Sequence, residues 1–147
     1  MTTGVRRDPF LDFRFLVEID SLLVAGFSEV QGIEAEVETE EWEEGGTNHY
    51  THTLPTRVTF PTITLSKGMT ASHELWSWMA ESLHGPAERK NGRIIMLDTT
   101  GAEARGWEFL EGYPVRWEGP DMAADGSDVA IESLEIAHNG LRAFGVG

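Results

Sequence analysis

The sequence predicts a mainly β domain of the α+β class: a two-sheet sandwich or partly closed β-barrel with one flanking α-helix. About six or seven stretches alternate apolar and polar residues, which is typical of strands with one buried face. A single stretch carries apolar residues at helical spacing and needs a sheet to cover. With 147 residues, of which 40% are hydrophobic, the chain is expected to form one domain over residues 1–147.

The composition excludes several classes of protein. The formal net charge of −14 argues against an electrostatic grip on nucleic acid, which needs clustered lysine and arginine. The chain has no cysteine, which excludes disulfides and thiolate metal sites. No apolar run approaches the roughly 20 residues that span a bilayer, and no signal-peptide pattern is present. We therefore expect assembly in the cytoplasm and no direct membrane insertion by this chain.

Residues 1–9 are expected to form an N-terminal arm, and the first strands follow it. Alternation over 13–19 predicts a strand, and 22–27 begins a second one. Over 33–41 the alternation is strict, with Ile33, Ala35, Val37 and Thr39 on one face and Glu34, Glu36, Glu38 and Glu40 on the other. A solvated sheet face with a buried reverse side accounts for the alternation. It does not explain why every polar position is glutamate, a poor strand former, so selection for negative surface potential is the alternative.

The alternation stops at residues 41–53, which predict a long loop or an extended hairpin. His49 and His52 in this segment form a His-x-x-His pair. Zinc needs three or four ligands of set geometry, and no adjacent histidine, cysteine or aspartate completes the pair. An extended interaction loop over residues 42–54 is therefore the preferred interpretation, with no metal expected.

The clearest local signal is a strand followed by a helix. The strand pattern of 57–66 slips by one position at Pro61, which predicts a β-bulge or a strand break. Thr70 is the expected N-cap of the helix, and Gly85 and Pro86 end it. The helical face comprises Leu75, Trp78, Met79, Ser82 and Leu83.

Trp76 lies off this helical face, so it is either a core residue or an aromatic anchor of a subunit contact. Three further strands are expected after the helix, over 93–98, 107–118 and 129–138. A second phase slip is expected near Ser133, where the apolar residues of the last strand change face.

No catalytic residues are assigned. The sequence has no Gly-x-Ser-x-Gly signature, and its paired glycines at 45–46 lack the lysine and the helix of a phosphate-binding loop. No pattern pairs two carboxylates in a cleft as glycoside hydrolysis requires. The residues therefore favour a binding or structural module without enzyme activity, cofactor or metal.

Several separated motifs occur in order along most of the chain, without large insertions. They are Asp8-Pro9-Phe10 followed by Val17-Glu18-Ile19, the stretch AGFSEVQGI at 25–33, Leu54-Pro55, the stretch FPTITLSKGMT at 60–70, and ELWSW at 74–78. Together they resemble the tail tube proteins of contractile-tailed bacteriophages and of the related extracellular contractile injection systems.

This resemblance implies a tail-tube-like fold and a structural role. Tail tube proteins form hexameric rings, and the rings stack into a hollow inner tube through which DNA or effector cargo passes. The implied partners are further copies of the chain, the sheath protein, and baseplate or tube-initiator and terminator proteins. The implied location is a virion or a released phage tail-like particle.

The resemblance also implies roles for particular residues. Subunit or ring contacts are expected at the N-terminal arm, at the 42–54 loop and on the exposed flank of the helix. The residues expected there are Asp8, Phe10, Trp42, Glu44, Gly45, Gly46, Asn48, His49, Tyr50 and Trp76. The lumen of the tube is expected to be lined by Glu34, Glu36, Glu38 and Glu40. Negative charge there would keep DNA or acidic cargo from adhering.

Three alternatives make different predictions. A closed lipocalin-like β-barrel that binds a small apolar ligand would be a stable monomer with a ligand-sized cavity. An enzyme with a spatially assembled carboxylate site would show a cleft with strongly perturbed carboxylates. A tube-end or sheath-adaptor protein would share the tail-tube fold and would cap the tube instead of extending it.

Overall fold

The computed structural model of the chain describes residues 14–20, 23–43, 51–69, 71–122 and 130–145. In chain order its elements are β1 (Arg14–Ile19), β2 (Leu23–Phe27), β3 (Glu29–Gln31), β4 (Glu36–Glu43), β5 (Thr51–Thr59), β6 (Ile63–Gly68), α1 (Glu74–Leu83), β7 (Lys90–Leu97), β8 (Glu103–Glu118), β9 (Ile131–Ala137) and β10 (Gly140–Phe144).

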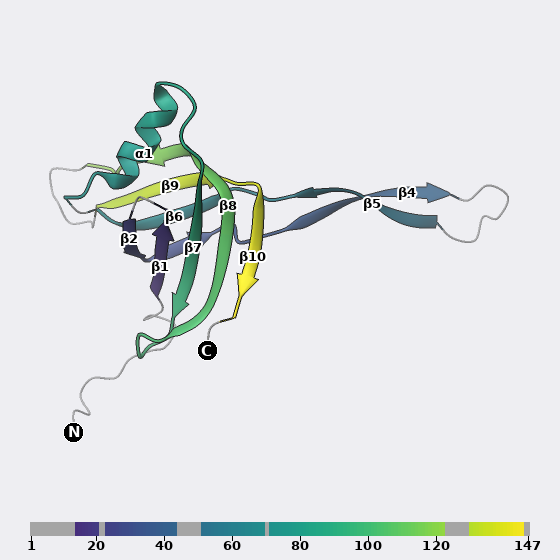
Figure 1. Ribbon diagram of the computed structural model, residues 1–147, viewed down its shortest axis with the longest axis horizontal. Helices are drawn as coiled ribbons and strands as arrows, with labels where there is room; N and C mark the ends of the chain where they lie inside the picture. Colours follow the sequence, from purple (N-terminus) through teal and green to yellow (C-terminus); the bar gives the residue numbers. More distant parts are fainter. Residues whose placement is uncertain (1–13, 21–22, 44–50, 70, 123–129, 146–147) are drawn as a thin grey trace.

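The body of the protein consists of two antiparallel sheets that share strand β8 (Figure 1). The strand order is β2-β1-β7-β8-β9-β6-β3, with β10 paired to β8 and with β4 and β5 in a separate two-stranded sheet. The first half of β8 pairs with β7 and β10, and its second half pairs with β9. One long strand therefore carries the chain from one layer into the other.

A local irregularity accompanies the change of sheet along β8. Glu111 has a φ of 53°, in the left-handed region, and its N–H donates to Asn91 Oδ1 at 2.9 Å. Before this point Phe109 is buried, whereas after it the buried positions are Gly112 and Pro114. The inward-facing phase of the strand therefore shifts by one residue at Glu111, as a β-bulge requires.

The two edges of the body approach each other. β2 and β3 lie at opposite ends of the strand order but are separated in the chain by Ser28 alone. The Ser28 N–H donates to Ser66 O at 3.0 Å, which ties this link to β6. No ladder joins β2 to β3 in the described part of the chain, so the body is a curled sandwich and not a closed barrel. The predicted mainly β, two-sheet class with one helix is confirmed, and the closed lipocalin-like barrel is not found.

The core lies between the sheets and is covered by α1, whose Leu75 and Trp78 are buried. The Trp78 indole N–H donates to Glu88 O at 3.0 Å, and the Ser82 hydroxyl donates to Pro114 O at 3.1 Å. The other buried apolar residues of this core are Val17, Ile19, Phe27, Ile63, Leu65, Ile94, Phe109, Leu134 and Ile136. Among the described residues there is no helix with the length and apolarity needed to cross a membrane.

The helix begins later than predicted. It starts at Glu74, after His73, whose side chain makes no capping hydrogen bond; the Glu74 N–H donates to Ser72 Oγ at 3.4 Å. The expected N-cap, Thr70, lies outside the described residues. Burial of Leu75 confirms the predicted helical face at its first turn, whereas Leu83 at the end of the helix is exposed.

One predicted irregularity is confirmed and the other is wrong. The strand pattern does break around Pro61, because β5 ends at Thr59 and β6 begins at Ile63. No slip occurs near Ser133, since β9 pairs with β6 in continuous register. The apparent slip arises because Glu132, and not an apolar residue, occupies an inward-facing position of β9. The short strands β3 and β10 were not predicted, because neither shows a run of alternating residues.

The strands β4 and β5 form a hairpin that projects from the body as a long ribbon (Figure 1). Their ladder has one register shift, between Glu38 and Thr39. β4 continues to Glu43 and β5 resumes at Thr51, with residues 44–50 outside the described part of the chain. The extended hairpin is therefore the correct alternative for this segment.

Candidate functional site

One face of the hairpin exposes an apolar pair. Val37 lies directly opposite Val58 in the ladder, and these side chains are 51% and 57% exposed. The alternation over residues 33–41 predicted that this face would be buried, and within the single chain that prediction is wrong. A two-stranded hairpin is marginally stable in water by itself. An exposed apolar pair along such a ribbon therefore favours a covering partner.

The opposite face of the hairpin carries the predicted carboxylates. Glu36, Glu38 and Glu40 occupy alternate positions of β4, so their side chains share one face, and all three are exposed. Glu34 precedes the strand and is exposed as well. Arg57 Nε lies 3.5 Å from Glu38 Oε2 across the ladder, a surface ion pair that offsets only part of the negative charge.

Large apolar residues also lie on this acidic face, towards the end of the hairpin. Trp42 continues the alternation of β4, and Leu54 lies opposite Glu40. Both are about half exposed. Because apolar side chains are exposed on both faces, either face can bury area against another molecule.

Most of the other predicted contact residues lie outside the described part of the chain. They are Asp8, Phe10, Glu44, Gly45, Gly46, Asn48, His49 and Tyr50. Of the predicted set, the structure therefore describes Trp42 on the hairpin and Trp76 on the helix, which belong to separate regions of the molecule.

Trp76 lies beside a pocket on the flank of α1. Trp76 is 41% exposed, so it is not enclosed in the core of the single chain. Its ring meets the ring of Trp117 edge to face, with centroids 5.0 Å apart. The pocket has a volume of about 280 Å³ and is lined by Met69, Ser72, His73, Trp76, Trp117 and Glu132.

A buried carboxylate, that of Glu132, is among the groups that line this aromatic pocket. Glu132 is only 2% exposed. Its Oε2 accepts a hydrogen bond from the Trp117 indole N–H at 2.9 Å. Its other oxygen, Oε1, is buried and has no hydrogen-bond partner. Sequence reasoning missed this residue, although the interrupted apolar pattern near Ser133 was the signal of a buried polar side chain.

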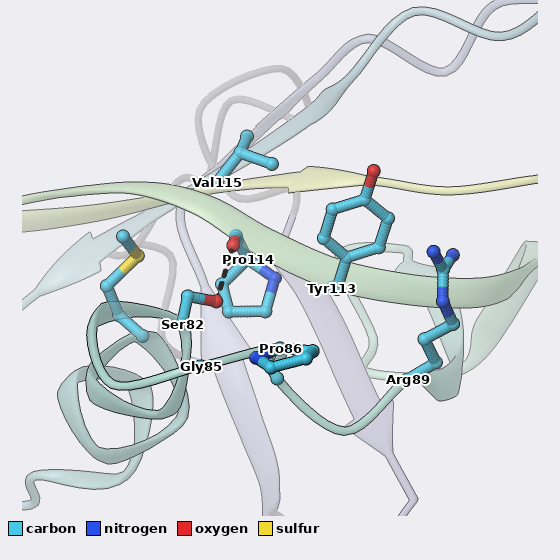
Figure 2. Close-up of a pocket in the computed structure, with 9 residues that line it drawn as sticks. Ser82, Gly85, Pro86, Arg89, Tyr113, Pro114 and Val115 are labelled. Carbon is cyan, nitrogen blue, oxygen red and sulfur yellow. Dashed lines mark hydrogen bonds between the residues drawn. The ribbon is translucent and has the colours of Figure 1, made fainter.

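A second pocket lies between the C-terminal end of α1 and β8 (Figure 2). Its volume is about 440 Å³. The Arg89 guanidinium lies over the Tyr113 ring, 4.4 Å from its centroid, at one end of the pocket. The remaining lining residues are Met79, Ser82, Gly85, Pro86, Ala87, Pro114 and Val115. The surface is largely apolar and offers no pair of carboxylates for acid–base chemistry.

The acidic residues of the described chain do not gather into a metal site. No group of three or more histidine, aspartate or glutamate side chains there could hold a metal ion. Asp98 has a lowered pKa, because its carboxylate accepts hydrogen bonds from the Thr100 hydroxyl and from the backbone N–H groups of Thr100 and Ala102. This carboxylate closes the turn between β7 and β8 and lies in neither pocket.

Comparison with solved structures shows the fold. The chain matches a chain of the sheath-tube complex of an extracellular contractile injection system, PVC, with a TM-score of 0.79 and 22% identity, over 90% of this chain and 89% of that one. It matches the anti-feeding prophage (AFP) cap with a TM-score of 0.79 and 18% identity, over 99% of each chain. It also matches Hcp1 from Flavobacterium johnsoniae with a TM-score of 0.58 and 16% identity, over 90% of this chain and 96% of that one.

Comparison with curated protein sequences gives no match. A family model does match, and it covers residues 11–142. That model describes the T4-like virus tail tube protein gp19. The chain therefore belongs to the T4-like virus tail tube protein family, whose members are structural and not enzymatic, and it is a tail tube protein.

Proposed function

We propose that the chain assembles into hexameric rings that stack into the hollow inner tube, and that the β4–β5 hairpin makes the principal contact between subunits. The observation that carries this proposal is the exposure of Val37 and Val58 on a ribbon that projects from the body. Burial of this pair by a neighbouring copy removes apolar area from water and stabilises the ribbon.

The free strand edges of the body support the same assembly. In the described part of the chain β10 pairs only with β8, and β2 pairs only with β1, so each offers an unpaired edge. Exposed edges invite pairing with another chain unless they are covered. In a ring, the free edge strand of one subunit pairs with the free edge strand of the next. The sheets of neighbouring subunits then form one continuous sheet around the ring.

Further contacts are assigned to the segments that the resemblance identified. The N-terminal arm, with Asp8 and Phe10, packs on a neighbouring subunit. The hairpin end, from Trp42 to Leu54, contacts the adjacent subunit or ring. Trp76 is 41% exposed on the flank of α1, so it is available for a contact with another protein of the particle.

The lumen is assigned to the acidic face of the hairpin. Glu36, Glu38 and Glu40 point to one side of the ribbon, and Glu34 continues the acidic run at its base. Their negative potential keeps DNA or acidic protein cargo from adhering during passage. A structure of the assembled tube with these carboxylates on the outer surface would contradict the assignment.

Sheath, baseplate and terminator proteins are the proposed partners of the tube. Support comes from the similarity to chains in a sheath-tube complex, in the AFP baseplate and in a sheath/tube terminator. Assembly takes place in the cytoplasm, and the product is a virion or a released tail-like particle. A tube-end role is the second candidate, because the AFP cap matches over 99% of this chain with the same TM-score as the sheath-tube chain.

The test is the size and shape of the purified chain, measured by light scattering and negative-stain electron microscopy. We expect rings or hollow filaments of uniform width, and Val58→Asp should abolish them because it places a charge in the buried contact. The variant should remain folded, since Val58 is exposed in the single chain.

Met122→Asp is the matched control, because Met122 is also exposed and lies outside the hairpin. Normal assembly of the Val58→Asp chain, or equal loss of assembly in both variants, would contradict the hairpin contact. Rings that do not stack, even when seeded with baseplates, would favour the tube-end role.

A further inference from the structure

We infer that the aromatic pocket on the flank of α1 binds a basic side chain, arginine or lysine, of a partner protein whose sequence differs from this chain. The pocket is the one lined by Met69, Ser72, His73, Trp76, Trp117 and Glu132. This binding role is separate from ring formation by the hairpin, because α1 and the hairpin lie on different sides of the body (Figure 1).

The carboxylate of Glu132 supplies the negative charge that attracts the basic side chain. The side chain is 2% exposed, and the Trp117 indole N–H satisfies only Oε2. Oε1 is buried without a donor. A buried polar atom that lacks a hydrogen bond is costly, and a buried carboxylate oxygen is more costly than a neutral one. An N–H group of a guanidinium or ammonium supplies the missing donor together with the opposite charge.

The walls of the pocket suit the same ligand. The rings of Trp76 and Trp117 meet edge to face at 5.0 Å, and tryptophan is the preferred aromatic partner of a cation. Met69 adds an adaptable apolar surface for the aliphatic stem of a basic side chain. The volume of about 280 Å³ accommodates the end of one such side chain and excludes a folded segment. Trp76 is 41% exposed, so the pocket opens on the protein surface.

Charge complementarity favours a partner of different sequence over a second copy. The chain has 25 acidic and 11 basic residues, and most basic side chains in its described part already have acidic or aromatic neighbours. The ion pairs are Arg57 with Glu38, Lys90 with Glu88, Arg93 with Glu18, Arg116 with Glu118 and Arg142 with Glu108, while Lys67, Arg89 and Arg105 lie over aromatic rings.

The inference is tested with blocked arginine amide as the probe and blocked citrulline amide, its neutral isostere, as the comparison. The chain is labelled with 5-fluorotryptophan, and the fluorine resonances of Trp76 and Trp117 are followed during titration. We expect a saturable shift of both resonances with the arginine probe and none with citrulline. Glu132→Gln should weaken binding by about tenfold or more, because it removes the buried charge and keeps the side-chain shape.

The matched control is Glu118→Gln, which removes the same charge from an exposed position on β8 outside the pocket. Equal binding of arginine and citrulline, wild-type affinity in Glu132→Gln, or equal weakening by Glu118→Gln would overturn the inference. If Glu132→Gln unfolds the chain, Trp76→Ala replaces it, since Trp76 is a surface residue. An unchanged arginine affinity in Trp76→Ala would overturn the inference as well.

The basic side chain could come from a protein of different sequence or from a second copy of this chain. Sedimentation of the purified chain distinguishes these two sources. We expect Glu132→Gln to self-associate as the unmodified chain does, because the occupant comes from another protein. Loss of self-association in Glu132→Gln but not in Glu118→Gln would show that the occupant is a second copy, and would overturn the assignment to a different sequence.

Discussion

The two strands on either side of Pro61 differ in what covers them. In β6, Ile63 and Leu65 are fully buried in the core of the body. In β5, Val58 follows the same alternating pattern but is 57% exposed on the projecting hairpin. An apolar alternation therefore indicates that one face will be buried, but it does not say whether the same chain or another chain provides the cover.

The junction between these two regions is held by contacts from elsewhere in the chain. The buried ring of His138 lies between Gly140 O, 2.9 Å from Nδ1, and Pro61 O, 3.2 Å from Nε2. Gly32, which follows β3 and precedes the hairpin, has a φ of 93° and packs closely against the backbone of Thr62. These contacts fix the direction in which the hairpin leaves the body.

The largest expected effect is a difference in the free energy of unfolding between a variant in the body and a variant in the hairpin. Leu65→Ala should lower the free energy of unfolding by about 2–5 kcal/mol, because it leaves a cavity in the core. Val58→Ala should change it by no more than about 0.5 kcal/mol in dilute, unassembled protein, because the side chain is already exposed. Urea denaturation of both variants measures the difference. A similar loss in both would show that the hairpin face is covered within the single chain.

A smaller loss is expected at the junction. Gly32→Ala should cost about 1–3 kcal/mol, because a β-carbon there collides with Thr62 O and the backbone has a positive φ. Gly68→Ala is the control, since Gly68 lies at the end of β6 and a β-carbon there meets no atom within 4 Å. Thermal unfolding of the two variants tests this prediction. Equal melting temperatures would show that the junction adapts without strain and that the hairpin direction is not fixed by Gly32.

The smallest effect concerns a surface turn of the body and depends on pH. The lowered pKa of Asp98 means that the folded state favours the ionised carboxylate, which accepts hydrogen bonds from Thr100 and Ala102. This contribution is fully present above the unfolded pKa of about 3.8 and is lost as the pH falls through the lower folded value. Asp98→Asn should therefore be less stable than the unmodified chain at neutral pH. The difference between their free energies of unfolding should disappear in acid.

Urea denaturation at a series of pH values measures the difference in the free energy of unfolding between Asp98→Asn and the unmodified chain. Asp121→Asn provides the comparison, because Asp121 is exposed and lies beyond the end of β8. A difference that stays constant in acid would contradict the role assigned to the Asp98 hydrogen bonds.

The sequence by itself determined the local features of this protein. Period-two alternation predicts most of the strands, and the slip at Pro61 predicts the break between β5 and β6. The spacing of Leu75 and Trp78 predicts the buried side of α1. These features follow from the geometry of a strand or a helix, which repeats within a few residues and so leaves a mark in the sequence.

The tertiary structure decided the features that depend on distant neighbours. It placed β8 in two sheets through the bend at Glu111, exposed Val37 and Val58 on a projecting ribbon, and buried Glu132 beside Trp117. Burial depends on which elements pack together, and no local pattern records that packing. For the same reason, the buried Glu132 has the appearance of a phase slip when only the sequence of this strand is considered.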